Sequence, residues 1–121
     1  MKVKRVNWIS QEALEAEVVV TDGEFDISCF AQPFKQLGED EFIETIFCLN
    51  VQNIVKVDQR DYHIEKSVGH FSYCLVGECI DKHDGKVQLG NLLFELDNRL
   101  IAGDIIDGDF ISFCCERLDI Y

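Results

Sequence analysis

The sequence predicts a mainly β fold: a small antiparallel Greek-key barrel or a sandwich of about six strands, with little helix. Three observations predict it. Apolar and polar residues alternate with a period of two through most of the chain. Turn residues separate the alternating runs. The chain holds one proline, so its strands can run without interruption. At 121 residues with 47% hydrophobic residues, residues 1–121 fit a single β domain with a sizeable core.

The first two strands are predicted to form a hairpin. In LEAEVVVT every second residue from Leu14 onward is apolar, which is typical of a half-buried strand. Asp22 and Gly23 follow, and Asp-Gly is a strong hairpin signal. The next run alternates from Phe25 to Ala31. Ser10 could cap a helical turn before the hairpin, but the run of three valines favours a strand.

The middle of the chain predicts one strand between two irregular segments. KQLGEDE, residues 35–41, reads as a loop because Gly38 and three acids interrupt the pattern. FIETIFCLNVQNIVKV, residues 42–57, predicts one long or bent strand, with the bend near Asn50 and Asn53. DQRDYHIEKSVG, residues 58–69, is polar and irregular and leaves room for a helical turn.

Three further strands complete the prediction. HFSYCLVGECI (70–80) is a strand with a bulge or bend at Gly77, and the turn DKHDGK closes a hairpin with VQLGNLLFEL (87–96). The apolar phase of the second run flips at Gly90, which predicts a bulge there. GDFISFCCERLDIY (108–121) is the last strand.

The alternation also predicts the core. The side chains expected to supply most of it are Leu14, Val18, Val20, Phe25, Ile27, Phe47, Leu49, Phe71, Tyr73, Leu75, Leu89, Phe94, Ile111 and Phe113.

Three phrases resemble a family of small uncharacterised bacterial proteins with an OB-like β-barrel: EAEVVVTDGEFDISCFAQPF, FSYCLVGECID and GDFISFCCERLDIY. Within IIDGDFISF, Gly108 would take a turn conformation that other residues resist. The resemblance implies an OB-like fold and a bacterial cytoplasmic setting. It implies no activity, since a fold does not fix a function.

The charge is strongly negative. Eleven Lys and Arg against 23 Asp and Glu give a net charge of −12. Such a surface repels nucleic-acid phosphates and anionic lipids, so nucleic acid and membrane are not the expected partners. It would attract a basic protein or simply keep the domain soluble. No secretory signal follows MKVKRVNWIS, which predicts a cytoplasmic protein with reduced thiols.

The six cysteines are expected to be free thiols that pack in the core: Cys29, Cys48, Cys74, Cys79, Cys114 and Cys115. Neighbouring residues on a strand face opposite ways, so Cys114 and Cys115 suit neither a zinc site nor a bond to each other. Because Cys115 shares its face with Ile111 and Phe113, we expect it to be the more buried thiol and Cys114 the more reactive one.

No catalytic, cofactor or metal motif is present in the sequence. The residues singled out for partner binding are two groups of acids: Glu39, Asp40 and Glu41 in the 35–41 loop, and Asp104, Asp107 and Asp109 in DIIDGD. The second group lacks the calcium-loop spacing and also reads as turn chemistry. His63, His70 and His83 form no metal-ligand pattern, although a cysteine–histidine pair could still meet in space.

These observations favour a non-enzymatic acidic binding module that contacts another, plausibly basic, protein. One version is an immunity-type inhibitor of a basic toxin. The alternatives are an OB-type binder of a ligand or nucleic acid, and a metalloprotein or enzyme with a Cys/His site.

Overall fold

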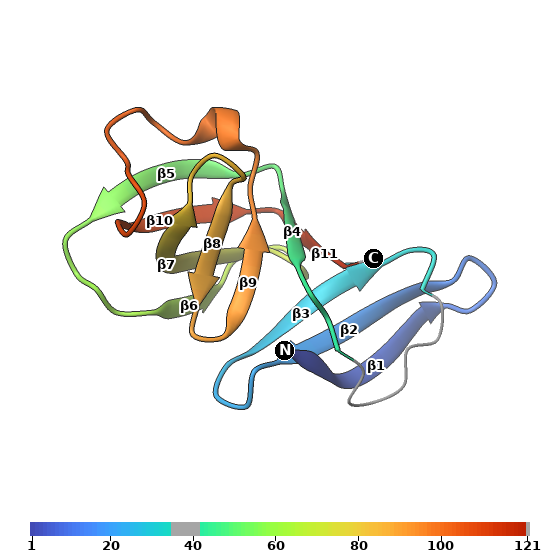
Figure 1. The fold of residues 1–121 in the computed structure, drawn as a ribbon. Coiled ribbons are helices and arrows are strands. Elements are labelled where there is room, and N and C mark those ends of the chain that lie inside the picture. Colours follow the sequence, from blue (N-terminus) through green and yellow to red (C-terminus); the bar gives the residue numbers. More distant parts are fainter. Residues whose placement is uncertain (35–41, 121) are drawn as a thin grey trace.

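The computed structural model describes residues 1–34 and 42–120, and these residues form a mainly β structure (Figure 1). The elements are β1 (Lys2–Ser10), β2 (Glu15–Thr21), β3 (Asp26–Ala31), β4 (Ile46–Leu49), β5 (Gln52–Val57), β6 (His63–Lys66), β7 (Tyr73–Asp81), β8 (Lys86–Leu89), β9 (Leu92–Glu95), the 3-10 helix η1 (Asn98–Leu100), β10 (Phe110–Cys115) and β11 (Arg117–Asp119). Among the described residues, no helix is long and apolar enough to cross a membrane.

The strands form one mixed sheet with the order β1-β2-β3-β11-β4-β9-β8-β7-β10-β5, and β6 pairs with β7 beside this path. Most neighbours are antiparallel, whereas β11 runs parallel to β3 and β4 runs parallel to β9. Figure 1 shows β1, β2 and β3 on one side of the molecule and β5, β10, β7 and β6 on the other. The short strands β4 and β11 connect the two sides.

The mainly β prediction is confirmed, but the described residues form eleven strands where about six were expected. Three predicted strands are each divided in two. The break at residues 50–51 separates β4 from β5, a turn at residues 90–91 separates β8 from β9, and Glu116 separates β10 from β11. Two strands were not foreseen: β1 at the start of the chain, and β6 in the polar segment where a helical turn was considered.

Gly90 forms a hairpin turn instead of the predicted bulge. Leu89 pairs directly with Leu92, which leaves Gly90 and Asn91 as a two-residue loop. Gly90 has a φ of +60°, as the first central residue of a tight hairpin turn requires. A reversal of the chain changes the apolar phase as a bulge does, and for this reason the sequence pattern alone could not separate the two.

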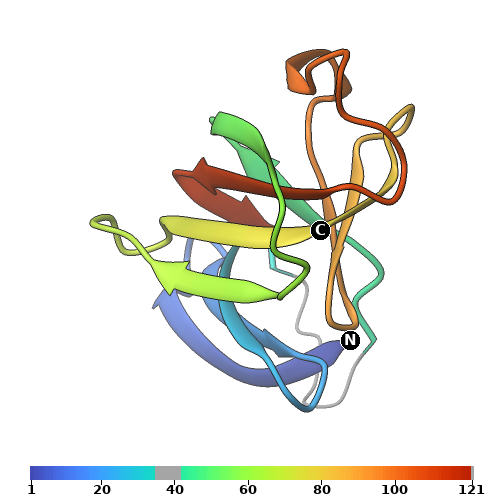
Figure 2. The same ribbon diagram turned by 90° about the vertical axis from the view of Figure 1, so that its left-hand side faces the viewer.

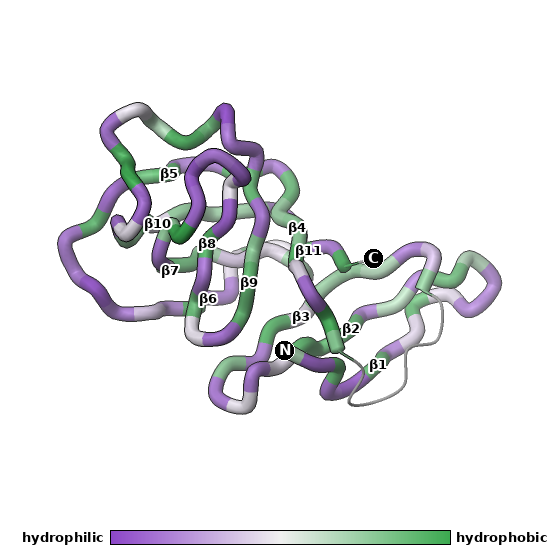
Figure 3. Tube along the Cα trace, in the orientation of Figure 1, coloured by the Kyte–Doolittle hydropathy of each residue, from purple (hydrophilic) through white to green (hydrophobic). Residues whose placement is uncertain are grey.

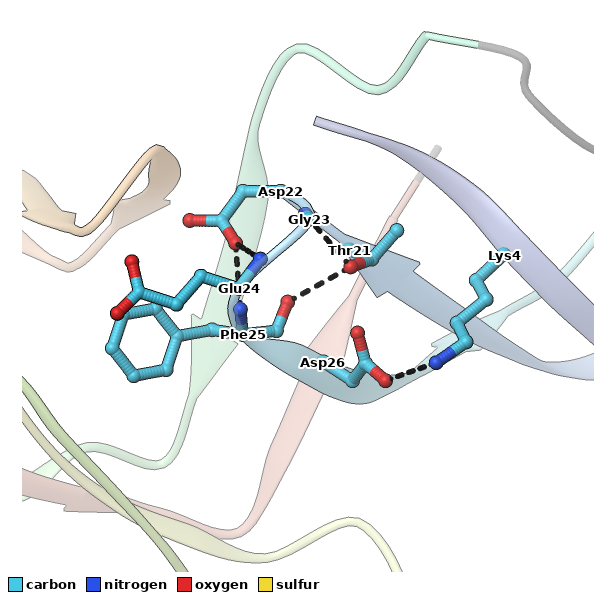
Figure 4. A network of polar contacts seen from close by, with 7 residues as sticks. All are labelled: Lys4, Thr21, Asp22, Gly23, Glu24, Phe25 and Asp26. Atoms are coloured by element: carbon cyan, nitrogen blue, oxygen red, sulfur yellow. Dashed lines mark hydrogen bonds and ion pairs between the residues drawn. The ribbon is translucent and has the colours of Figure 1, made fainter.

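The first predicted hairpin is confirmed, because β2 and β3 pair antiparallel from Ala16–Ala31 to Thr21–Asp26. Asp22 organises its turn (Figure 4): the Asp22 Oδ1 atom accepts hydrogen bonds from the backbone N–H groups of Glu24 (2.9 Å) and Phe25 (2.7 Å). Its Oδ2 atom accepts the N–H of Asn91 at 2.7 Å, which ties this turn to the β8–β9 turn. Lys4 on β1 reaches Asp26 at the start of β3.

The core lies on the inner side of the strands, and Figure 3 shows hydrophobic and hydrophilic residues alternating along them. Most of the predicted core residues are buried, but five are not. Leu14 is 41% exposed because it lies in the β1–β2 turn with a φ of +56°. Strand β4 buries Ile46 and Cys48, so Phe47 and Leu49, on the opposite face, are only half-buried. Phe71, which precedes β7, is also half-buried, as is Phe25, which packs against the core.

Candidate functional site: the outer face of β5, β10, β7 and β6

Strand β10 lies at the centre of a four-stranded face. It pairs with β5 on one side and with β7 on the other, and β6 pairs with the first half of β7. Figure 2 looks onto this face and shows β5, β10, β7 and β6 stacked in that order. We call the side of these strands that is turned away from the core the outer face.

Side chains of β10 and β7 alternate between the core and the outer face. Ile111, Phe113 and Cys115 of β10 are buried, as are Leu75 and Cys79 of β7. The residues between them are only partly buried: Ser112, Cys114, Cys74, Val76 and Glu78. The outer face therefore carries a mixture of polar, apolar, acidic and sulfur-containing side chains.

The β5–β6 connection, residues 58–62, forms a wall over one part of this face. Arg60 donates a hydrogen bond to the carbonyl oxygen of Gly108 (3.2 Å), and its guanidinium lies 4.8 Å from the centre of the Phe110 ring. The ring centres of Tyr62 and Phe110 are 5.4 Å apart. In Figure 2 this connection passes in front of β10 and β7. These contacts hold the wall against the start of β10.

A hollow of about 690 Å³ lies beside this wall. Most of the side chains that line it are charged or polar. Its lining residues are Lys56, Val57, Asp58, Gln59, Asp61, Tyr62, His63, Val76 and Ser112.

A disulfide bond joins Cys74 of β7 to Cys114 of β10 on the same outer face. The two residues are directly opposite each other in the antiparallel ladder, and their Cα atoms are 4.0 Å apart. The prediction that all six cysteines are free is wrong for this pair. The prediction that Cys114 is the more reactive thiol fails for the same reason, since its sulfur is already bonded.

A second hollow, of about 450 Å³, opens beside the disulfide. Glu65, Lys66, Ser67 and Val68 line it together with Cys74. Lys66 also donates hydrogen bonds to the carbonyl oxygens of the neighbouring turn, including that of Gly69. Cys74 is thus the half of the disulfide that faces a solvent-accessible hollow.

The other four cysteines are free thiols buried on the core side, as predicted for them: Cys29, Cys48, Cys79 and Cys115. Burial raises the pKa of the Cys29 and Cys48 thiols well above the usual range, which keeps them protonated. The greater burial of Cys115 relative to Cys114 is confirmed.

The histidines lie apart from these thiols. His70 contacts Glu17 at 2.9 Å and His63 lies 3.7 Å from Glu65, both on the surface, while His83 lies in the β7–β8 turn. Within residues 1–34 and 42–120, no three His, Cys, Asp or Glu side chains gather as a metal-binding group.

The acids predicted to bind a partner have different surroundings. Glu39, Asp40 and Glu41 lie outside the described residues. Asp107 accepts a hydrogen bond from the N–H of Lys82 (2.8 Å), and Asp109 accepts one from the N–H of Ile106 (3.0 Å). That N–H bond, with help from Lys56 and Arg60, lowers the pKa of Asp109. Two of the three aspartates therefore stabilise loops, and Asp104 is exposed.

Several of these aspartates lie at one end of the molecule. There the β7–β8 turn, η1 and the 101–109 loop are joined by hydrogen bonds from Lys82 Nζ to the Ala102 carbonyl (2.8 Å) and from Asn98 to the His83 carbonyl (2.5 Å). Figure 1 shows η1 and the 101–109 loop at the top of the molecule, with the β7–β8 turn just below them. We call this region the acidic end and define it by Asp81, Asp84, Asp97, Asp104 and Asp107.

Many of the basic side chains are occupied by contacts within the chain. Lys82 and Arg99, the cations of the acidic end, bond to the Ala102 carbonyl and to Asp97. The same pattern holds elsewhere: ion pairs occupy Lys4, Lys56, Lys86 and Arg117, and backbone carbonyl oxygens accept bonds from Arg60 and Lys66. Most of the basic side chains in the described residues therefore make contacts within the chain, although several of them are exposed to solvent.

Sequence reasoning missed the disulfide and the two hollows. One signal was present in the sequence. The alternation predicted for β7 and β10 places Cys74 and Cys114 on the face of each strand that is turned away from the core. The pairing register between the two strands, which the sequence does not reveal, was needed to bring the sulfurs together.

No family model matches this chain, and neither a curated protein nor a solved structure matches it. The resemblance to small bacterial proteins with an OB-like barrel therefore stays a prediction.

Proposed function

We propose that this protein is a non-enzymatic acidic binding module that contacts a basic protein through its acidic end. The observation that carries the proposal is the arrangement of charge. The net charge is −12, and at the acidic end Arg99 pairs with Asp97 alone while Lys82 Nζ bonds to the Ala102 carbonyl oxygen. An incoming cationic surface would meet the remaining carboxylates of the acidic end, those of Asp81, Asp84, Asp104 and Asp107, which speeds association and favours a partner of opposite charge.

An immunity-type inhibitor is one concrete version of this function. Such an inhibitor needs only a charged, rigid surface that covers the basic face of its target. The acidic end offers rigidity because its three segments are joined by hydrogen bonds that involve Asp107, Lys82 and Asn98.

A matched pair of charge variants tests the proposal. D84N/D104N removes two charges from the acidic end, and E12Q/E24Q removes two from exposed turns of the β1–β2–β3 region. Each variant and the wild type is used to capture proteins from the native host at about 50 mM salt, where charge attraction is strong. We expect one basic protein to be retained by the wild type and E12Q/E24Q and lost from D84N/D104N. Equal retention by all three, or no retained protein, contradicts the proposal.

A second candidate is a ligand or a single nucleic-acid strand bound in the 690 Å³ hollow. It is favoured by Lys56, Tyr62 and His63, which combine positive charge with an aromatic surface, as single-strand binders do. Asp58 and Asp61 in the same lining oppose an anionic ligand. A titration with labelled single strands at about 50 mM salt separates the two candidates, since phosphate contacts are strongest at low salt.

We also propose that the strands form an OB-like or Greek-key barrel. This proposal is supported by the run β4-β9-β8-β7-β10-β5, which curves around the core in Figure 1. The bacterial, cytoplasmic setting likewise stays a prediction.

A further inference from the structure

We propose that the Cys74–Cys114 disulfide is a thiol–disulfide exchange site, which a dithiol reductant opens in the folded protein by attacking the sulfur of Cys74. The inference concerns a different part of the molecule from the acidic end and does not depend on the proposed binding function.

The disulfide bond lies on the outer face, where solvent can reach it. Strand alternation places Cys74 and Cys114 away from the core, whereas Cys29, Cys48, Cys79 and Cys115 are buried. Within the described residues, the one pair of cysteines that is oxidised is also the pair that solvent reaches. Exchange needs an attacking thiolate to reach a sulfur, and exposed disulfides are the labile ones.

The hollow beside Cys74 supplies an approach path. Cys74 forms part of the lining of the 450 Å³ hollow, and the other lining residues come from β6 and the start of the following turn. Val68 on its rim is fully exposed. Cys114 is not among the lining residues and pairs with Gln52 of β5 on its other side. The approach therefore favours attack on Cys74, with Cys114 as the leaving group.

The dithiol supplies the two electrons that reduce the disulfide bond. One of its thiolates attacks Cys74 Sγ, the bond between Cys74 and Cys114 breaks, and the electron pair leaves on Cys114 Sγ, which then takes a proton. The second thiol of the reductant, as its thiolate, attacks the mixed disulfide and releases Cys74. The reductant becomes a disulfide as the protein gains two thiols, and the reverse reaction restores the bond.

The fold can retain its structure when the bond opens. Strands β7 and β10 pair over six residue positions from Phe110–Glu78 to Cys115–Tyr73, and their inner side chains Leu75, Ile111 and Phe113 stay buried. The four core thiols are shielded from the reagent, so exchange stays confined to the outer pair. Opening would change the outer face, between the two hollows, without dismantling the sheet.

The test uses the full-length oxidised protein and dithiothreitol as the probe. Samples are quenched in acid, alkylated and mapped by mass spectrometry. We expect two new thiols, at Cys74 and Cys114, at a rate proportional to the dithiothreitol concentration, with the near-ultraviolet circular dichroism retained. A rate independent of that concentration would mean that the bond opens only on unfolding, and would overturn the proposal.

A trapping experiment identifies the attacked sulfur. A Cys-x-x-Cys reductase whose second cysteine is replaced by serine cannot complete the exchange and stays bonded to the sulfur it attacks. We expect the adduct on Cys74. An adduct on Cys114, or none, contradicts the assigned direction.

Charge variants beside the hollow test the approach path. The attacking thiolate is negative, so E65Q should accelerate reduction and K66Q should slow it, each by about two- to threefold for one charge a few ångströms away in water. The controls E24Q and R5Q make the same charge changes far from the hollow and should leave the rate unchanged. Equal effects at both places would show that only net charge matters, and would refute the path.

Discussion

Removing the disulfide should cost a large share of the stability of this domain. In the double variant C74S/C114S, the cross-link between two residues 40 positions apart is lost. In the chain-entropy model, a closed loop of this length restricts the unfolded chain by about 13 cal/mol/K, or about 4 kcal/mol at 25 °C. Both positions are partly exposed, so serine hydroxyls can reach water and add little further cost.

Urea unfolding of the oxidised wild type and the variant, followed by circular dichroism, measures this difference in the free energy of unfolding. Reduction supplies the control. A phosphine reductant should lower the stability of the wild type to that of C74S/C114S within about 1 kcal/mol and should leave the variant unchanged. A variant that is as stable as the oxidised wild type would refute the entropic reasoning.

Three other predictions follow from the fold. Truncating Phe113, which is 1% exposed, with F113A should lower the free energy of unfolding by about 3–5 kcal/mol in urea, and a loss under about 1 kcal/mol would place it outside the core. Burial alone would raise the pKa of Asp22, but hydrogen bonds from the backbone N–H groups of Phe25, Asn91 and Glu24 lower it below 3.8. The stability that Asp22 contributes is therefore present above pH 3.8 and is lost as the pH falls through its lower pKa in the folded state. The urea midpoints of the wild type and D22N should therefore converge in acid. A difference between the two midpoints that stays constant with pH would contradict this. Gly85 and Gly23 both have a positive φ, but of the two only Gly85 would place a Cβ against backbone atoms, those of Leu96. Thermal unfolding should therefore show a larger loss of stability for G85A than for G23A. Equal losses of stability would contradict this close approach.

The alternation of side chains made much of the fold predictable. The β2–β3 hairpin follows from its valines and from Asp22–Gly23, and the inner faces of β7 and β10 follow from Leu75, Ile111 and Phe113. In these strands one face is clearly more apolar than the other, so the period of two assigns the core side without ambiguity.

The prediction of strands and of their buried faces failed where both faces of a segment are apolar or where neither face is apolar. In β4, Ile46 and Cys48 compete with Phe47 and Leu49, and only the packing of β4 between β11 and β9 decides which pair is buried. Strand β6 is largely polar because it lies at an edge and pairs with β7 alone. Its place in the sheet depends on the register with β7, which no local pattern carries.

The candidate site was predictable only in part. The opposite orientations of Cys114 and Cys115 follow from the strand, and the structure bears them out. The partner of Cys114 does not follow, because Cys74 is 40 residues away and is selected by the ladder between β7 and β10. Asp107 and Asp109 were expected to bind a partner or to form turns, and both accept backbone N–H bonds, from Lys82 and Ile106, as turn residues do.

Strand orientation sorts the six cysteines into one bonded outer pair and four core thiols. Peptide mapping of the protein after exposure to glutathione disulfide, alkylated first in the folded state and then in denaturant without reductant, tests it most directly. We expect one linked peptide pair that contains Cys74 and Cys114. We also expect the four remaining cysteines, Cys29, Cys48, Cys79 and Cys115, to react only after denaturation. Six alkylated cysteines without any linked peptide, or a linkage that involves a core cysteine, would contradict this sorting of the cysteines.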